Sequence, residues 1–405
     1  MNTCRCANCI MPPHILRRLL DSKNAKIRQA ALNTLLGTAR LRGERSVRAA
    51  TFAPLAPTNG RRTIFDARHS NDLTSAVVAR SEDGPPSSDG TVNRAYDGFG
   101  ATNDFYKEVF KRNSIDDKGM RLNGYVHRGI DFNNAFWDGE GMVFGDGDGA
   151  MFTDFTLSLD VIAHELSHGV TEFTANLEYH HQSGALNESM SDVFGSLVKQ
   201  WSLKQTADEA DWLIGAEVTT PAIKMDALRS LKAPGTAFNN AIMGKDPQPA
   251  HMKQFLKLPN TEEGDNGGVH INSGIPNKAF FLVATAIGGH AWDDAGQIWY
   301  DSLRASNPKT QFQEFADTTV VQAEKRFGAG SMQQQAVFDA WNQVGLKPTK
   351  IPSSAIASAV RGTDADAFGS LTKQIAALSA EVDALTRKVK GLESPRSAKK
   401  SARSK

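Results

Sequence analysis

The sequence predicts an α+β protein in which a β-rich segment precedes a helical segment and a separate helical repeat lies near the C-terminus. In the first part, short apolar runs such as residues 63–65 and 142–144 alternate with Gly, Asp and Pro clusters, which is typical of strands joined by turns. From Leu159 to Gly345 the apolar residues recur with helical spacing instead. Residues 371–392 follow a heptad pattern.

Length and composition are ordinary for a globular protein. The chain has 405 residues, of which 40% are hydrophobic and 22% charged, and its net charge is +1, which argues against nucleic acid as a partner. No stretch approaches the roughly 20 apolar residues that span a bilayer, so no membrane contact is expected. The N-terminal region lacks the apolar core of a secretory signal. We therefore predict a cytoplasmic protein, with non-classical secretion as the alternative.

Residues 1–50 form a basic segment with its own helical pattern. Arginine and lysine far outnumber acidic residues there. The apolar spacing predicts helix over residues 14–37, ending at Gly37, because glycine is common directly after a helix. Residues 38–60 mix Gly, Pro, Arg and Ser without periodicity, so we expect an exposed linker.

The middle of the chain divides at residue 158. One helix is expected within the β-rich part, over residues 102–112. Ser158 can cap the first helix of the next part, which begins at Leu159. The further helices expected in that part cover residues 187–201, 277–288, 293–305, 311–326 and 331–343.

The motif His-Glu-Leu-Ser-His at residues 164–168 has the spacing of a zinc site on a helix. Positions i and i+4 lie on one helix face, so the His164 and His168 imidazoles can reach one metal ion. Glu165 lies beside them and can take a proton from a metal-bound water. The alternative is a pair of histidines on a solvated helix.

A second pair of spaced residues follows twenty positions later. Glu188 and Asp192 are again i and i+4, so they share a helix face. Glu188 can supply the third protein ligand that a catalytic zinc needs. Asp192 can accept the remaining N–H of His164 and fix that ring. The alternative is a pair of surface carboxylates.

At this point the chain resembles the thermolysin-like metallopeptidases. The matching segments, in chain order, are Asn-Ala-Phe-Trp at 134–137, Gly-Asp-Gly-Asp-Gly at 145–149, the 164–168 motif, the Glu188 and Asp192 segment, and Asp-Asn-Gly-Gly-Val-His-Ile-Asn-Ser-Gly at 265–274. The resemblance implies the two-lobed fold of that family. Its β-rich N-terminal lobe would be residues 51–158, its helical C-terminal lobe residues 159–345, and zinc would lie in the cleft between them.

The resemblance also implies roles for individual residues. Tyr179 and His270 look like the pair that stabilises the oxyanion, and Asp265 like the residue that orients His270. Arg229 looks like the cation that holds a substrate carbonyl. Asn134 and Ala135 look like the edge along which a peptide substrate lies. Taken alone, Tyr179 would more often be a packing residue and Arg229 a surface ion-pair partner.

The reaction implied is that of a zinc-dependent neutral endopeptidase. It would hydrolyse internal bonds of peptides and proteins, before bulky hydrophobic residues. Two other functions are less consistent with the sequence. A different zinc hydrolase would not need the Glu188 segment together with residues 265–270. A catalytically inactive peptide-binding module would be expected to lack Glu165 or a ligand, and none is missing.

Calcium binding is where the chain departs from many relatives. It keeps Asp160 and Asp211, but carries Lys199 and Ala216 at two positions where calcium-binding relatives have glutamates. Losing carboxylates and gaining an ammonium argues against a double calcium site. Lys199 can instead neutralise Asp160 and Asp211.

The N-terminal segment resembles the short propeptide of the protealysin-like branch of the family. The match is Pro-Pro-His-Ile-Leu at residues 12–16. It implies a zymogen, made as an autoprocessed precursor with residues 1–50 as propeptide. A thiolate is a strong zinc ligand, so Cys4, Cys6 or Cys9 could cap the metal as an inhibitory thiol. The alternatives are a separate metal site and idle thiols.

The C-terminal region predicts self-association. After a linker at residues 346–366, a coiled coil is expected over 367–393, followed by a basic disordered tail at 394–405. β-branched residues alternate with leucine at the two core positions, which favours a parallel two-stranded coil and a homodimer. The alternative is a single helix folded back on the rest of the chain.

Overall fold

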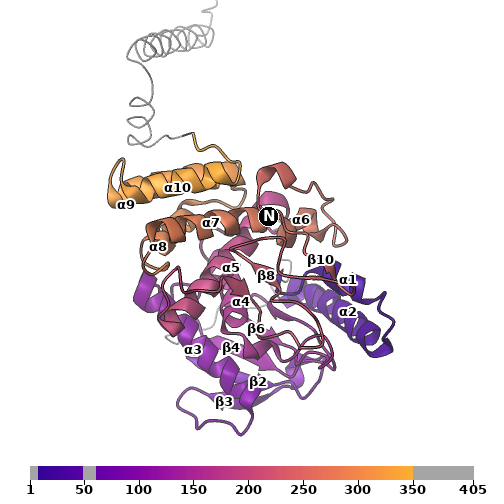
Figure 1. Ribbon diagram of the computed structural model, residues 1–405. Helices are drawn as coiled ribbons and strands as arrows, with labels where there is room; N and C mark the ends of the chain where they lie inside the picture. The colour runs from indigo at the N-terminus through magenta and orange to yellow at the C-terminus, as the bar shows by residue number, and fades with distance from the viewer. Residues whose placement is uncertain (1–7, 49–60, 350–405) are drawn as a thin grey trace, which may run out of the picture. The chain divides into compact units, whose positions relative to one another are not determined.

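The N-terminal segment is a short strand followed by two helices. The computed structural model describes residues 8–48 and 61–349. Its first elements are β1 (Asn8–Cys9), α1 (Pro13–Leu19) and α2 (Ala25–Arg48). α1 begins at Pro13. The first N–H groups of a helix have no hydrogen-bond partner within the helix, so a proline, which lacks this group, loses no hydrogen bond there. α1 lies beside β10 of the later chain (Figure 1), and Arg18 Nε donates to Ile242 O at 3.3 Å.

The expected linker from residue 38 is wrong in its first part, because α2 continues through Gly37 to Arg48. Thr38 and Leu41, one turn further on, are both buried, and Leu41 packs into a small apolar cluster with Phe132 and Phe136. Tertiary packing therefore carries the helix past a residue that would end it in isolation.

The strands from β1 to β6 form one mixed six-stranded sheet in the order β1-β5-β6-β4-β2-β3. They are β2 (Arg62–Asp66), β3 (Val77–Ser81), β4 (Leu122–Val126), β5 (Ala135–Trp137) and β6 (Gly141–Phe144). β2, β4 and β6 are parallel neighbours, whereas β5 is antiparallel to both β6 and β1. The N-terminal strand β1 thus covers the edge that β5 would otherwise expose.

The helix expected at residues 102–112 is longer than predicted. It is α3 (Gly90–Phe110), and the Asp89 side chain accepts a hydrogen bond from Thr91 N–H at its start. α3 packs on the sheet, because a side chain at Gly124 of β4 would meet the Phe99 ring at 2.8 Å. The Asp89 cap is the N-terminal signal that the apolar spacing alone did not locate.

The second part of the chain is helical, as predicted. Its helices are α4 (Leu159–Glu172), α5 (His181–Leu203), α6 (Asp265–Asn272), α7 (Gly274–Ile287), α8 (Asp294–Ala305), α9 (Phe312–Phe327) and α10 (Met332–Gln343). α4 is buried from Asp160 to Thr171. It lies beside α5 (Figure 1) and packs against Trp137 of β5. One cluster of buried apolar residues contains side chains of α4, of the sheet strands and of the other helices.

Short strands and turns connect α5 to α6. They are the pairs β7 (Leu213–Ile214) with β8 (Arg229–Ser230) and β9 (Asn239–Asn240) with β10 (Gly244–Lys245), followed by a 3-10 turn at Met252–Gln254. Two other 3-10 turns of the described residues lie earlier, at Leu73–Ser75 and Phe155–Leu157. Within residues 8–48 and 61–349, no helix combines the length and the apolar character needed to cross a membrane. The predicted coiled coil and basic tail lie outside the described residues.

Candidate metal centre

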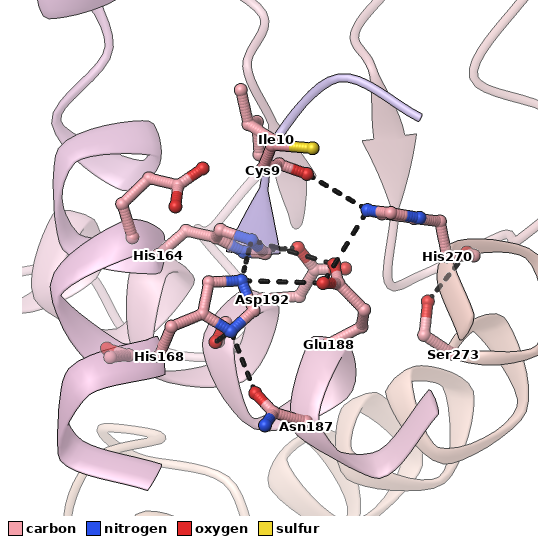
Figure 2. Close-up of polar contacts among 12 residues, drawn as sticks. Cys9, Ile10, His164, His168, Asn187, Glu188, Asp192, His270 and Ser273 are labelled. Carbon is pink, nitrogen blue, oxygen red and sulfur yellow. Dashed lines mark hydrogen bonds and ion pairs between the residues drawn. The ribbon is translucent and has the colours of Figure 1, made fainter. Parts of the chain in front are cut away.

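Two adjacent helices bring the three expected metal ligands together. α4 carries His164 and His168, α5 carries Glu188, and all three side chains are fully buried. The Nε2 atoms of the two histidines are 3.0 Å apart. One donor atom from each of the three residues lies within 4.8 Å of the others, the one such group of three or more His, Cys, Asp or Glu found in the described part of the chain. Figure 2 shows both rings directed toward Glu188.

The residues present fit a single divalent metal ion. Glu188 Oε2 is buried and has no hydrogen-bond partner among the described residues, although a buried carboxylate is costly without compensation. Glu188 Oε1 accepts a hydrogen bond from Tyr179 and lies 3.4 Å from His168 Nε2. Two imidazole nitrogens and a carboxylate are the donor set of a catalytic zinc site.

The outer nitrogens of both rings are held by α5. His164 Nδ1 lies 2.9 Å from Asp192 Oδ1, as expected from the sequence. His168 Nδ1 lies 2.8 Å from Asn187 Oδ1 and 2.9 Å from Ser191 Oγ. Such contacts fix each ring so that Nε2 faces the metal position. Sequence reasoning missed Asn187 and Ser191, although their positions one before and three after Glu188 place them on the same side of the helix.

Glu165 lies between the metal position and β5. Its Oε2 accepts a hydrogen bond of 3.0 Å from Trp137 N–H, and the side chain is fully buried. Burial, reinforced by the nearby Glu188 charge, raises the pKa of Glu165 well above its ordinary value. A carboxylate with a raised pKa is a stronger base, which suits proton transfer at neutral pH.

Tyr179 and His270 face the centre from the other side. The Tyr179 hydroxyl is 3.2 Å from His270 Nε2, and His270 Nδ1 donates to Asp265 Oδ1 at 2.5 Å. Burial by itself lowers the pKa of His270, but the charges of Glu188 and Asp265 outweigh it and raise that pKa to about 9. His270 can therefore donate from both nitrogens at neutral pH.

A tight turn brings Asp265 back to His270. Asn266, Gly267 and Gly268 all have positive φ angles inside the segment assigned to α6. A Cβ on Gly267 would lie 2.2 Å from His181 Nδ1, so only glycine fits there. The Gly-Gly pair in the sequence motif thus has a structural purpose, which is to fold the orienting carboxylate onto the histidine.

Arg229 is buried and forms its ion pair with Asp192, so it is not a surface residue. Its Nε and Nη2 lie 2.8–3.1 Å from the Asp192 oxygens, and Asn277 Nδ2 donates to the same carboxylate at 2.8 Å. Burial by itself raises the pKa of Asp192, but the charge of Arg229 and the hydrogen bond from His164 lower it below its ordinary range. Asp192 therefore links the His164 ring to Arg229. Sequence reasoning gave no sign of this link or of Asn277.

The N-terminal segment occupies the edge where a substrate peptide was expected. β1 pairs antiparallel with β5, with Cys9 opposite Phe136. The four contacts that follow along the segment are His270 Nε2 to Cys9 O at 2.9 Å, Ile10 N to Ala135 O at 3.2 Å, Arg229 Nη1 to Ile10 O at 3.0 Å, and Met11 N to Asn134 Oδ1 at 3.0 Å. Every residue expected to bind substrate is thus bound to this segment (Figure 2 shows the Cys9 contact).

Of the three cysteines considered as an inhibitory thiol, only Cys9 lies among the described residues. Cys9 approaches His270 with its carbonyl oxygen, while its thiol lies 3.8 Å from Met11 O. Cys9 is not a member of the group formed by His164, His168 and Glu188. Cys4 and Cys6 lie outside the described residues. The thiol cap therefore stays a prediction, while the backbone carbonyl of Cys9 does contact the site.

Lys199 lies among the acidic residues, Asp160 and Asp211, that a calcium site would use. Its Nζ lies 3.1 Å from Asp160 Oδ2 and 3.0 Å from Asp211 Oδ2. Glu217, which sequence reasoning did not consider, contributes a third carboxylate at 3.5 Å. Burial by itself lowers the pKa of Lys199, but these three carboxylates raise it above its ordinary value. The Lys199 ammonium thus lies among the carboxylate oxygens that a calcium ion would need as ligands.

Comparisons with known proteins agree along most of the chain. The family model described as thermolysin metallopeptidase, catalytic domain, matches residues 57–172, and the one described as thermolysin metallopeptidase, alpha-helical domain, matches residues 175–346. An "Extracellular metalloprotease" of Pectobacterium carotovorum subsp. carotovorum is 46% identical over 340 residues, which are 84% of this chain and 96% of that protein.

Two further metalloproteases are also similar to this chain. An "Extracellular minor metalloprotease" of Serratia marcescens is 41% identical over 290 residues, which are 70% of this chain and 78% of that protein. Among solved structures, the "Precursor of Protealysin, Metalloproteinase from Serratia proteamaculans" is similar with a TM-score of 0.75 and 48% identity. That match covers 84% of this chain and 100% of the solved chain.

Proposed function

This chain belongs to the thermolysin family of metallopeptidases, and we propose that His164, His168 and Glu188 hold its zinc ion. It is a zinc metalloendopeptidase of the neutral, thermolysin-like type. The observation that carries the ligand assignment is the convergence of two imidazole nitrogens on a buried carboxylate, one oxygen of which has no hydrogen-bond partner among the described residues. In this proposal the zinc lies in a cleft between a β-rich lobe, residues 51–158, and a helical lobe, residues 159–345.

Glu165 is the general base of the proposed mechanism. When bound, zinc supplies a Lewis acid that polarises the substrate carbonyl and makes a water molecule more acidic. Glu165 takes a proton from that water and passes it to the nitrogen of the departing amine. Its raised pKa favours taking the proton, and the hydrogen bond from Trp137 N–H keeps its other oxygen in place.

The remaining side chains bind the peptide and the developing negative charge. His270 and Tyr179 donate hydrogen bonds to the oxyanion, and Asp265 holds His270 in the orientation that this requires. Arg229 binds the carbonyl of the residue after the cleaved bond, while Asn134 and Ala135 bind the substrate backbone as an added strand. The complete burial of Ile10 at this position supports cleavage before bulky hydrophobic residues.

The protein is made as an autoprocessed precursor, as the similarity to the protealysin precursor indicates. We assign residues 1–50 as its propeptide. The described part, from β1 to the end of α2, supports this assignment, because it binds the same groups that a substrate would use. While the segment stays there, an external peptide cannot reach the β5 edge, so the precursor is inhibited by its own backbone.

The prediction of a cytoplasmic protein is wrong. The Pectobacterium and Serratia marcescens relatives are both named as extracellular metalloproteases, and this indicates a secreted protein. The prediction rested on a missing apolar signal sequence, which is only one of the features that direct export.

Removing the metal tests the proposed function directly. After treatment with a zinc chelator and gel filtration, the purified protein is expected to lose hydrolysis of casein, because neither the substrate carbonyl nor the water is then activated. Zinc added back should restore hydrolysis at one ion per chain, measured by elemental analysis of the same samples. Full activity in a preparation free of zinc would contradict the proposal.

Calcium removal is expected to have little effect on stability. Lys199 already neutralises Asp160 and Asp211, so we expect a calcium-selective chelator to change the Tm by less than about 2 °C. Calorimetry with and without the chelator measures this. In the matched variant Lys199→Met the carboxylates lose their cation, so the Tm should fall and added calcium should recover part of it. A fall of tens of degrees in the chelated wild type would show an intact calcium site elsewhere.

We also propose a coiled coil over residues 367–393, which lie outside the described residues. The alternation of β-branched residues and leucine over residues 371–392 supports a parallel pair of helices. In that arrangement two catalytic units would be joined as a homodimer through residues 367–393. Residues 346–366 would separate each unit from the coil.

A further inference from the structure

Resting on the peptidase function proposed above, we infer that the chain's own Cys9–Ile10 bond is a self-cleavage site, held in the reacting position of the same molecule. The N-terminal segment would then be a bound substrate as well as an inhibitor. The chemical class of this substrate is an extended peptide with an aliphatic residue directly after the cleaved bond.

The first support is the direction and register of the segment. Cys9 pairs with Phe136 in an antiparallel ladder, and the chain continues with Ile10 N–H donating to Ala135 O at 3.2 Å. Met11 N–H then donates to Asn134 Oδ1 at 3.0 Å. The segment therefore lies along the β5 edge as an added strand at Asn8–Cys9. It bends at Ile10 and Met11 but keeps its hydrogen bonds to Ala135 and Asn134 there.

The second support is the pair of consecutive carbonyl groups that His270 and Arg229 bind. His270 Nε2 binds the Cys9 carbonyl oxygen at 2.9 Å, and the Tyr179 hydroxyl is 3.2 Å from the same nitrogen. These are the groups proposed to stabilise the oxyanion, so the carbonyl in the reacting position is that of Cys9. Arg229 binds the next carbonyl, that of Ile10, at 3.0 Å.

The third support is the position of the leaving nitrogen. The Ile10 N–H donates to Ala135 O of β5 at 3.2 Å, and Glu165 Oε2 accepts from the N–H of Trp137 in the same strand at 3.0 Å. Because β5 holds both groups, Glu165 is the base assigned to deliver the proton to that nitrogen. The Ile10 side chain on the same residue has 0% exposure, so the position after the bond is filled by an aliphatic group.

The cleavage step is a simple hydrolysis. The oxygen of water bonds to the Cys9 carbonyl carbon, the bond from that carbon to Ile10 N breaks, and Glu165 carries the proton from the water to the Ile10 amine. The products are a peptide of residues 1–9 with a new carboxylate and a chain that begins at Ile10.

The cut does not by itself release the rest of the segment. The helices α1 and α2 keep their own contacts with the catalytic part, including Arg17 with Glu263 at 2.9 Å and Thr34 Oγ1 with Asn133 N–H at 2.9 Å. Gly37 of α2 packs against Arg128, whose Nη2 donates to Gly37 O at 3.3 Å. The chain beginning at Ile10 thus stays docked after the cut, and inhibition would outlast the first cleavage.

Intact mass spectrometry of the full-length precursor tests the inference. The protein is purified with chelator, zinc is added, and samples are taken at several protein concentrations while casein hydrolysis is followed in parallel. We expect the peptide of residues 1–9 and a chain beginning at Ile10, formed at a rate that does not depend on protein concentration. Ile10→Asp should slow this cut by about 100-fold, because a carboxylate would have to be placed where the Ile10 side chain is fully buried. Leu32→Asp, which changes an exposed residue of the same segment, should not slow it.

The outcomes separate this inference from the proposed function. If casein is hydrolysed while the Cys9–Ile10 bond stays intact, or if the cut forms only at a rate proportional to protein concentration, the inference is overturned and the peptidase assignment stands. If neither casein nor this bond is cut after zinc is added, both the proposed function and the inference that rests on it are contradicted.

Discussion

Glu165→Gln is expected to abolish peptide hydrolysis while leaving the metal bound. The amide has the size of the carboxylate but cannot accept a proton from water, so kcat should fall by about 10²–10⁴-fold. The proposed ligands His164, His168 and Glu188 are unchanged, so zinc content should stay at one ion per chain. Steady-state kinetics on a fluorogenic peptide and elemental analysis of the same preparation measure the two quantities.

The precursor of the same variant should remain whole. Wild-type precursor is expected to process itself after zinc is added, whereas Glu165→Gln should keep its full mass. Glu108→Gln is the matched control, since it makes the same chemical change at an exposed position of α3. Wild-type activity in Glu165→Gln, after contaminating proteases have been removed, would show that another group takes the proton.

Asp192→Asn is expected to have the largest effect on stability. The change leaves Arg229, which is 2% exposed, without its anionic partner, and breaking a buried pair in this way typically costs about 3–5 kcal/mol. His164 also loses the carboxylate beside Nδ1, which should weaken zinc binding by about 10–100-fold. Urea unfolding and competition with a zinc indicator measure these effects, both in a Glu165→Gln background that prevents self-cleavage.

The pH dependence of that difference follows from the pKa of Asp192. Arg229 and His164 lower this pKa in the folded state, so the pair contributes stability above the ordinary aspartate pKa of about 4 and loses it as the pH falls through the folded value. The wild type should therefore exceed the variant in free energy of unfolding by a constant amount between about pH 5 and 8, and by less in stronger acid.

A surface ion pair provides the control for Asp192. Asp301→Asn breaks the Asp301–Arg326 pair, whose N···O distance is 2.7 Å and whose side chains are 24% and 36% exposed. Exposed pairs contribute about 0–1 kcal/mol, so this variant should remain close to wild type. Asp192→Asn would contradict the prediction if it lost no more stability than Asp301→Asn and kept wild-type zinc affinity.

Much of the metal centre could be predicted because its spacing is local. His164 and His168 are one helical turn apart, as are Glu188 and Asp192, so each pair shares a helix face before any packing is known. The structure brings these two faces together, with Asp192 Oδ1 at 2.9 Å from His164 Nδ1. Helical periodicity also located α7 to α10 to within a few residues.

Contacts between distant segments could not be predicted in this way. Asn187 and Ser191 carry no spacing signal of their own, and Arg229 reaches Asp192 from a short strand that the apolar pattern does not reveal. Glu217 joins Lys199 only because a loop returns to α5. α2 continues past Gly37 because Leu41 finds a buried position against Phe132 and Phe136.

The sequence by itself determined the chemistry of the site and the order of its parts. Metal ligands, base and oxyanion donors depend on residue type and on separations of a few positions, which one helix or turn converts directly into geometry. Only the tertiary structure decided what lies against that site. Residues 9–11 bind His270, Arg229 and Asn134 across separations of more than 100 positions. A strand can add to any open sheet edge through its backbone, and backbone hydrogen bonds are the same for every sequence. The register that puts the Cys9 carbonyl at His270 is therefore set by how α1 and α2 pack on the catalytic part, and no local pattern in the sequence records it.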